Sequence, residues 1–303
     1  MKSRRGIRNW SGSSAGLIKS ELVPDNTPKT SFSAAEKTGM IALGGAVLLL
    51  FIHPFLAAVP LAVFLALCFC APFFPQYSFF LPVISRGLPG SQGVALTFDD
   101  GPSPASTPVL LELLARHKLQ ATFFVVGEKA AKYPELIAEI IAQGHTIGNH
   151  SWQHDNFLML RSWKTVQKDI HATQTILQAY GVQPLVFRPP VGITSPRVVN
   201  VLATEGLVTV TFSCRAFDRG NRNIHNLAEK ILSRLQPGDI IMLHDLPPCR
   251  QALSDYWQQE LDSLFATLAR TVDVVTLAQI IGRPVMKEHI PLQGLKGALG
   301  KHG

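Results

Sequence analysis

The sequence predicts an α/β protein, a distorted (β/α) barrel of about seven parallel strands, preceded by one or two transmembrane helices. From Arg86 onward, short apolar stretches alternate with helical patterns, which is typical of a parallel barrel or of a doubly wound sheet. Polar residues recur where these stretches end. None of the 48 residues between Lys37 and Arg86 is Asp, Glu, Lys or Arg. We therefore divide the chain into segments 1–37, 38–85, 86–285 and 286–303.

The first segment is basic. Residues 1–37 are rich in Ser, Lys, Arg, Asn and Gly, show no apolar periodicity and carry +4 of the net charge of +7. Such a composition predicts a disordered stretch rather than a packed element. At the other end of the chain, residues 286–303 are expected to form a loose tail.

The second segment predicts a membrane anchor. Residues 38–52 and 55–74 are apolar and are separated by His53-Pro54, and a membrane-spanning helix needs about 20 such residues. A hairpin of two spans is favoured, with one longer span or a buried core helix as alternatives. Residues 73–81 resemble an aromatic interfacial belt, and the basic N-terminus is expected to stay cytoplasmic. At the cell membrane, one span would put the main domain outside, whereas a hairpin would return it to the cytoplasmic side.

The main domain, 86–285, contains seven predicted strands. Each except the last is followed by a predicted helix, and about 190 residues suffice for one core. The strands are 94–98, 121–126, 145–149, 185–188, 208–213, 239–243 and 272–277, and the helices are 107–117, 129–143, 163–180, 196–205, 224–235 and 251–270.

Charge and cysteine content exclude some functions. The main domain carries only +1 of the net charge, so a nucleic-acid-binding face is not indicated. Cys68 and Cys70 lie in the apolar stretch and Cys214 and Cys249 stand alone. With no Cys-x-x-Cys pair, neither a zinc ribbon nor a disulfide framework is predicted.

The polar residues at the strand ends suggest a metal site. Asp99 and Asp100 end the first strand in Asp-Asp-Gly-Pro, which is either a solvated turn or a pair of repelling carboxylates that needs a cation. His150 and His154, four residues apart, would lie on one side of a helical turn and could bind one ion together. A carboxylate added to them would give a His₂-carboxylate set with positions left for water and substrate, which suits hydrolysis.

The order of the motifs resembles one family. Thr-Phe-Asp-Asp-Gly-Pro at 97–102, His-Ser-x-x-His at 150–154, Arg-Pro-Pro-x-Gly at 188–192 and Leu-His-Asp at 243–245 are similar to the polysaccharide deacetylases of carbohydrate esterase family 4. The resemblance covers residues 93 to about 282. It implies a carbohydrate deacetylase whose metal, typically zinc with Co²⁺, Ni²⁺ or Mn²⁺ as alternatives, is held by Asp100, His150 and His154.

Further roles are implied by the same resemblance. Asp99 would be the general base and His244 the general acid. Asp218 and Arg188 match the pair that orients this histidine, with Arg188 also placed to bridge to the base. The backbone N–H of Val191 would hold the oxyanion, and Leu243 would line the pocket for the acyl methyl.

This chain also departs from the family pattern. Val191 stands where an aromatic residue is common. The pattern Asp-x-x-Asp-Trp appears as residues 215–219, in which Asp218 is kept while Arg215 and Arg219 replace the first Asp and the Trp. These arginines, with Arg222 close by, could meet an anionic group such as a phosphate, or could form a solvated basic loop.

The leading hypothesis is a membrane-anchored, metal-dependent deacetylase. Its substrate would be the N-acyl amide of an amino sugar in a polysaccharide, oligosaccharide or cell-envelope glycan. One alternative keeps the mechanism and makes the substrate a lipid-linked sugar, from which an acyl or formyl group is removed. The other is a non-catalytic domain that binds glycan and anchors a complex at the membrane.

Overall fold

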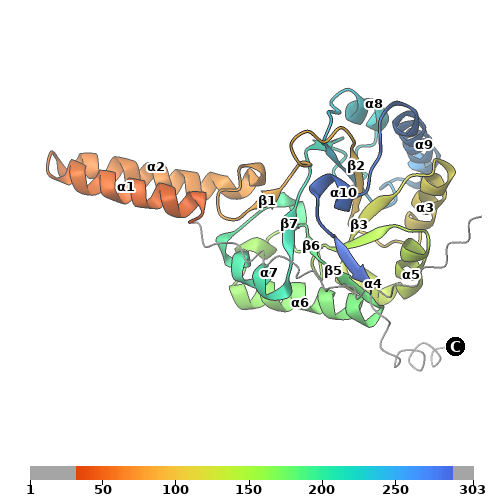
Figure 1. Cartoon of the computed structure of the whole chain (residues 1–303), viewed down its shortest axis with the longest axis horizontal. Helices are drawn as coiled ribbons and strands as arrows, with labels where there is room; N and C mark the ends of the chain where they lie inside the picture. The colour runs from red at the N-terminus through yellow and green to blue at the C-terminus, as the bar shows by residue number, and fades with distance from the viewer. Residues whose placement is uncertain (1–31, 289–303) are drawn as a thin grey trace, which may run out of the picture. The chain divides into compact units, whose positions relative to one another are not determined.

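A computed structural model describes residues 32–288. Within this range, eight strands form one sheet that is parallel in every pairing (Figure 1). The C-terminal ends of the strands therefore meet at one rim. The predicted fold class is confirmed. In spatial order the strands are β1 (Val83–Ile84), β7 (Val208–Val210), β6 (Val186–Phe187), β4 (Thr146–Asn149), β3 (Ala121–Val125), β2 (Ala95–Asp99), β9 (Ile240–His244) and β8 (Cys214–Arg215).

The helices of the main domain lie outside the sheet, apart from α10 (Figure 1). They are α3 (Thr107–Arg116), α4 (Gly127–Lys132), α5 (Pro134–Ala142), α6 (Trp163–Ala179), α7 (Val199–Glu205), α8 (Leu227–Leu232), α9 (Ser254–Thr271) and α10 (Leu277–Ile281). Single 3₁₀ turns are η1 (Ala71–Phe73), η2 (Pro75–Tyr77), η3 (Leu158–Leu160), η4 (Pro190–Gly192), η5 (Pro196–Val198) and η6 (Gln251–Leu253).

The two faces of the sheet have different surroundings. Side chains alternate along a strand, so Leu96 and Phe98 of β2 face the outer helices and belong to the large core cluster. Ala95 faces inward and joins a second cluster in which Leu277 and Ile280 of α10 pack against the first residues of several strands. Helix α10 therefore closes the N-terminal end of the inner face, and the C-terminal end remains for polar residues.

The last predicted strand, 272–277, is wrong. Val274 makes only an isolated bridge to Val94, and the chain then enters α10. Thr276 and Gln279 form a reciprocal capping box at the start of this helix, and such a box favours a helix over a strand. The predicted helix 129–143 is likewise two helices, α4 and α5, because Pro134 begins the second one and cannot donate a hydrogen bond inside a helix.

Two short strands lie in segments that were assigned to the anchor and the tail. β1 pairs with β7 at the edge of the main sheet although it falls within 38–85. β10 (Met286–Glu288) pairs antiparallel with β5 (Val182–Pro184), so the predicted tail begins with a strand. The rest of that tail and residues 1–31 of the basic segment lie outside the described residues, and residues 34–37 already belong to a helix.

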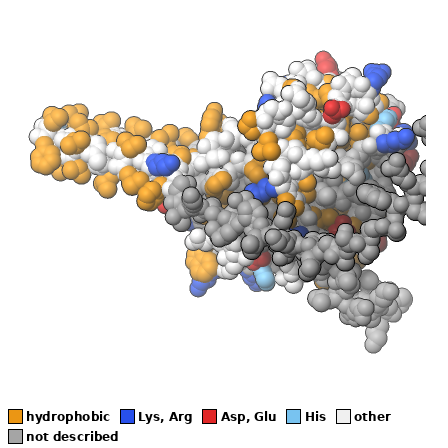
Figure 2. All heavy atoms as spheres, viewed as in Figure 1, with side chains coloured by type: hydrophobic (Ala, Val, Ile, Leu, Met, Phe, Trp, Pro, Cys, Tyr) orange, Lys and Arg blue, Asp and Glu red, His pale blue; other side chains and the backbone are white. Residues whose placement is uncertain are grey.

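The apolar segment forms two helices, α1 (Ala34–Leu50) and α2 (Pro54–Cys70), which contact each other. Their side chains are largely exposed; Phe55 is 77% and Phe69 76% exposed, and hydrophobic atoms cover the hairpin (Figure 2). Among the described residues, one helix, Pro54–Phe73, is long and apolar enough to cross a membrane. The exposure of α2 argues against the alternative of a buried core helix.

The buried side chain of His145, directly before β4, predicts that the fold is sensitive to acid. Its side chain is 3% exposed, Nδ1 accepts a hydrogen bond from the Ala121 N–H at 3.3 Å, and Nε2 has no partner among the described residues. Burial lowers the pKa of His145 to about 4. Between about pH 6.5 and pH 4, His145 binds a proton in the unfolded chain but stays neutral in the folded protein. The free energy of unfolding is therefore highest above pH 6.5 and decreases as the pH falls through this range, by on the order of 3 kcal/mol.

The measurement is the free energy of unfolding of the wild type and of His145→Gln at pH 7.5 and pH 4.5. Other groups titrate equally in both proteins, so the difference between the two pH dependences isolates His145. The wild type should lose more stability than the variant. Equal losses would show that His145 does not stay neutral in the folded protein.

Candidate active site

The predicted site residues converge at the C-terminal rim of the sheet. Asp99 ends β2, and His244, directly beside it in register, ends β9. His150 follows β4, and Arg188 follows β6. A cavity of about 950 Å³ opens between them, which is in the range of ligand pockets.

Asp100, His150 and His154 form the cluster that could hold a metal ion. Their donor atoms all lie within 4.8 Å of one another, and Asp100 Oδ1 is 3.1 Å from His154 Nε2 and 3.4 Å from His150 Nε2. The same Oδ1 atom is buried without a hydrogen-bond partner in the described part of the chain. One carboxylate and two imidazole donors, with an orphaned oxygen between them, fit a divalent ion of the zinc type.

The contacts around Asp100 and His150 also fit a metal-binding role for these residues. His150 Nδ1 lies 2.8 Å from the Arg188 carbonyl oxygen. When Nδ1–H donates a hydrogen bond to this oxygen, the lone pair of Nε2 on the side of Asp100 is free to bind a metal ion. Burial raises the pKa of Asp100, but the neighbouring imidazoles of His150 and His154 outweigh this effect, so the pKa of Asp100 lies below its usual range. The carboxylate is therefore ionised and ready to coordinate.

The prediction that the two histidines lie on a helical turn is wrong, because they lie on an irregular loop. Ser151 and His154 have φ of 70° and 54°, values that a right-handed helix does not allow. Hydrogen bonds hold the loop instead. Asn149 Oδ1 accepts from the Ser151 N–H, and Ser151 Oγ accepts from the His154 N–H.

Sequence reasoning missed Asp169, which fixes this loop from α6. Its Oδ1 accepts the Trp152 N–H at 2.7 Å. Burial raises the pKa of Asp169 to about 6, and the N–H groups of Trp152 and Gln153 oppose that shift. Asp169 lies 15 positions after His154 on a helix, so no motif spacing links the two.

We expect Asp169→Ala to weaken zinc binding about 10- to 100-fold, because the loop between the two histidine donors loses its acceptor. Asp169→Asn, which keeps one carbonyl oxygen, should lose less. Zinc affinity is measured by competition with a chromogenic chelator. Asp155→Ala is the matched control, since Asp155 lies beside His154 but pairs with exposed Arg161. If the Asp169 and Asp155 variants bind zinc alike, the positioning role is wrong.

Asp99 is held by the buried guanidinium of Arg188. Arg188 Nη1 donates to Asp99 Oδ1 at 2.6 Å and to Thr97 Oγ1 at 2.8 Å, and Nη2 donates to the Thr211 carbonyl at 2.7 Å. The guanidinium also lies over the Phe124 ring, 3.9 Å from its centroid. The predicted bridge from Arg188 to Asp99 is thus present, whereas no hydrogen bond joins Arg188 to His244 or Asp218 among the described residues.

His244 is paired with Asp218. The distance from His244 Nδ1 to Asp218 Oδ2 is 2.7 Å, which leaves Nε2 for the cavity that His244 lines. Burial lowers the pKa of His244, but the hydrogen bond and charge of Asp218, with Asp100 and Asp99 nearby, overcome it and raise the pKa above its ordinary value. The imidazole is therefore favoured in its protonated form, as a proton donor near neutral pH must be.

Asp245 follows His244 but makes no hydrogen bond to it among the described residues. It is fully buried and accepts hydrogen bonds from Ser106 Oγ and Thr107 Oγ1, both at 2.6 Å. Burial raises its pKa to about 6. Its backbone N–H donates to the Asp99 carbonyl. Asp245 thus ties the start of α3 to the strand end that carries the reactive carboxylates.

Lys129 of α4 was also missed. Its Nζ donates to the Asp100 backbone carbonyl at 2.6 Å, where Asp100 adopts a φ of 73°. This left-handed conformation is unusual for a residue other than glycine. The ammonium therefore helps to hold the backbone that presents the Asp100 carboxylate, and only the tertiary structure brings the two together.

The structure contradicts the prediction that Leu243 lines the acyl pocket. Leu243 is 1% exposed and belongs to the outer core cluster, whereas Met242 and His244 line the cavity. His244 and Met242 are two positions apart on β9 and share its inner face, so the residue between them points outward. Val191 lies at the mouth of the cavity, 55% exposed and with a φ of 51°, and Arg215 and Arg219 line the cavity as well.

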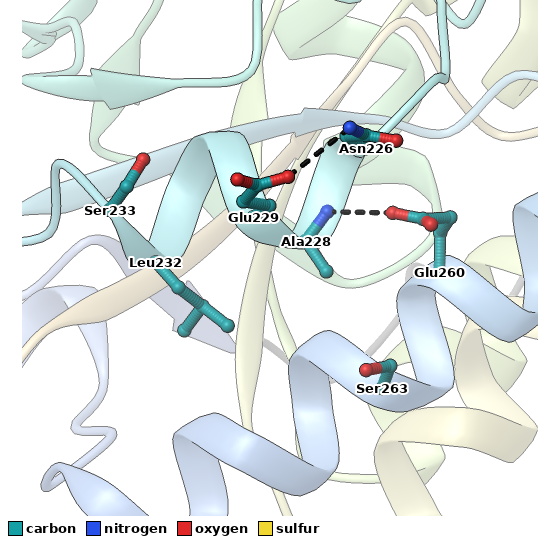
Figure 3. A pocket seen from close by; sticks show the side chains of 7 residues that line it. All are labelled: Asn226, Ala228, Glu229, Leu232, Ser233, Glu260 and Ser263. Carbon is teal, nitrogen blue, oxygen red and sulfur yellow. Dashed lines mark hydrogen bonds between the residues drawn. The ribbon is translucent and has the colours of Figure 1, made fainter.

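A second, shallower groove lies between α8 and α9 (Figure 3). Its two carboxylates already have partners. Glu260 accepts the Ala228 N–H at 2.9 Å, and Glu229 accepts from Asn226 Nδ2 at 3.2 Å. These contacts complete the first turn of α8, so we assign the groove to helix packing.

The fold and the site together are those of a hydrolase whose rim carries a cluster that could hold a metal ion. Three donors for one ion lie beside a carboxylate locked by arginine and a histidine locked by aspartate, all at the rim of one parallel sheet. This arrangement can activate water on one side of a carbonyl and protonate a leaving group on the other.

Comparisons with known proteins agree with this class. The polysaccharide deacetylase family model matches residues 87–210. The chain is 33% identical over 212 residues to a chitooligosaccharide deacetylase of Sinorhizobium fredii, covering 69% of this chain and 98% of that protein. It is 33% identical over 154 residues to a peptidoglycan-N-acetylglucosamine deacetylase of Bacillus cereus, covering 50% of this chain and 72% of the other.

A solved structure gives the same answer. The Bc1960 peptidoglycan N-acetylglucosamine deacetylase superposes with a TM-score of 0.61 at 28% identity, covering 67% of this chain and 94% of that one. The chain belongs to the polysaccharide deacetylase family, carbohydrate esterase family 4, whose members hydrolyse N-acetyl amide bonds of carbohydrates.

Proposed function

We propose that this protein is a membrane-anchored, metal-dependent deacetylase that removes the acetyl group from N-acetylglucosamine units of a glycan. One observation carries the proposal: Asp99, Asp100, His150, His154 and His244 meet around a single cavity. The names of the relatives, which act on chitooligosaccharides or peptidoglycan, support an amino-sugar substrate.

Asp100, His150 and His154 would hold the metal ion, with zinc as the best match to one carboxylate and two imidazoles. When bound, the ion supplies Lewis acidity toward the amide carbonyl and lowers the pKa of a coordinated water. The buried, partnerless Asp100 Oδ1 is the feature of this chain that fits such an ion.

The protein side chains would move the protons. Asp99, held by Arg188 at 2.6 Å, takes a proton from the attacking water as its oxygen bonds to the amide carbon. The Val191 N–H is the proposed donor to the resulting oxyanion. His244 then gives its proton to the amine nitrogen as the C–N bond breaks, and Asp218 stabilises the charged imidazole. The products are acetate and the free amino sugar.

The membrane anchor rests on the exposed apolar surface of α1 and α2. Helix α2 has no buried residue, and burying such a surface in a bilayer removes it from water. Two helices that contact each other favour a hairpin, which would keep the main domain on the same side as the N-terminus.

A lipid-linked amino sugar is a second candidate substrate, because the cavity wall is connected to the end of the apolar helix. The Thr194 N–H donates to the Pro72 carbonyl at 3.2 Å. Pro72 lies at the end of the membrane-spanning stretch, and Thr194 lies two residues after Gly192, which lines the cavity. The site would then open close to the membrane surface.

The test is acetate release from N-acetylglucosamine oligomers by the full chain in detergent. We expect turnover that chelation abolishes and that added zinc restores. Released acetate and the new amine are quantified separately, since both must appear in equal amounts. Turnover that persists in metal-free protein would contradict the metal role. Glycan binding without any acetate release would favour the non-catalytic alternative.

A further inference from the structure

Three arginines at the mouth of the cavity have no role in the chemistry described above. Arg215, Arg219 and Arg222 all line the cavity and are exposed. In the described part of the chain, none of them makes an ion pair. Their guanidinium groups are thus free for a ligand.

The loop that carries these arginines is fixed from beneath. Asp218 and Asn221 are 1% and 2% exposed. Asn221 Nδ2 donates to the His244 and Leu246 carbonyls, and the Asn223 N–H donates to the Asp218 carbonyl. The hydrogen bonds that hold the backbone beside His244 therefore also fix the backbone positions of Arg219 and Arg222.

Arg215 is held by aromatic rings. Its guanidinium carbon lies 4.3 Å from the centroid of Phe217 and 5.3 Å from that of Phe212. Stacking of this kind orients a guanidinium and leaves its edge N–H groups unused. Because Phe212 and Phe217 also line the cavity, the unused edge belongs to the site.

The loop that carries Arg219 and Arg222 passes close to Asp100, one of the three residues that could hold a metal ion. A Cβ placed on Gly220 would lie 4.0 Å from Asp100 Oδ2. Arg219 and Arg222 are one and two residues away from Gly220 in the chain, so their backbones lie close to the reaction centre. Three of the four carboxylates that line the cavity are engaged: Asp99 with Arg188, Asp218 with His244, and Asp100 with the histidines. The fourth, Glu128, is exposed and makes no ion pair among the described residues, so the three arginines still leave the mouth with a net positive charge.

We propose that Arg215, Arg219 and Arg222 form an anion subsite that binds a phosphate group carried by the amino-sugar substrate. Guanidinium groups bind phosphate oxygens in a bidentate manner. The subsite lies beside the metal cluster, so the phosphate would be attached to the reacting sugar or to its neighbour. The inference rests on the proposed deacetylase function and specifies its substrate class.

The experiment compares matched substrates. Acetate release is measured for N-acetylglucosamine-1-phosphate and for neutral methyl N-acetylglucosaminide, with the wild type and with Arg219→Gln, Arg215→Gln and Arg222→Gln. Arg270→Gln is the control, because Arg270 is an exposed arginine on α9 that does not line the cavity. We expect the wild type to prefer the phosphorylated sugar, and each cavity variant to lower the ratio of the two kcat/KM values about tenfold.

A third substrate separates two sources of the phosphate. A short prenyl-phosphate-linked N-acetylglucosamine in detergent should be preferred over the soluble sugar phosphate if the group belongs to a lipid, and equal rates would point to a soluble sugar phosphate. An unchanged ratio in all three variants, or a wild-type preference for the neutral sugar, would overturn the subsite.

If no substrate is turned over, the proposed deacetylase function fails and the subsite is judged by binding. Calorimetric titration of N-acetylglucosamine-1-phosphate into the zinc-loaded wild type and Arg219→Gln should then show binding that the variant weakens about tenfold. Equal affinities in the two proteins would rule the subsite out.

Discussion

Replacing Asp99 with Asn is expected to lower the deacetylation rate by roughly three orders of magnitude while zinc stays bound. The amide has nearly the same shape as the carboxylate and can still accept the hydrogen bond from Arg188 Nη1. It cannot take a proton from water at neutral pH. The loss therefore reports the base itself, provided that the metal and the fold remain.

Two controls make the result specific. Asp100→Asn alters the neighbouring carboxylate, whose Oδ1 faces His150 and His154, and should release zinc as well as activity. Metal content of each purified variant is measured by atomic emission, and folding by thermal unfolding. Full turnover in Asp99→Asn would refute the base assignment, and so would a loss of activity that follows loss of zinc.

The sequence predicted the parallel sheet and most of its strands, but it missed the edge strands β1 and β8. Parallel strands bring their C-terminal ends together, so polar residues that follow successive apolar stretches are expected to share one site. Asp99 and His244 lie opposite each other on β2 and β9, as that reasoning requires. The error in the seventh strand came from an apolar stretch whose helical capping box was not considered.

The face on which a side chain lies changes with every residue of a strand, so an error of one position moves it from the cavity to the outer core. Leu243 lies between Met242 and His244 on β9, and it packs in the outer core while its two neighbours line the cavity. Given His244 as a site residue, the alternation alone would have selected Met242.

The supporting residues could not have been predicted in this way. Lys129 contacts the backbone of Asp100, and Asp169 contacts the backbone of Trp152. Such contacts bind main-chain groups that every residue has, so they impose no partner side chain and no fixed spacing. They follow from how α4 and α6 pack beside the loops, which a single sequence does not encode in a readable pattern.

Replacing Arg188 with Met should produce the largest loss of stability, about 3–5 kcal/mol. Arg188 is 1% exposed, and its removal leaves the Asp99 carboxylate and the Thr211 carbonyl without their donor. Methionine fills a similar volume, so the loss is mainly electrostatic. Arg188→Lys keeps the charge but not the planar fork of donors, so its free energy of unfolding should lie between those of the wild type and of Arg188→Met. The measurement is denaturant unfolding of the full chain in detergent.

The double variant Asp99→Asn/Arg188→Met tests the cause. It removes both charges, so it should be more stable than Arg188→Met alone, and the difference from additivity gives the coupling of the pair. A purely steric effect of methionine would leave the two variants equally unstable.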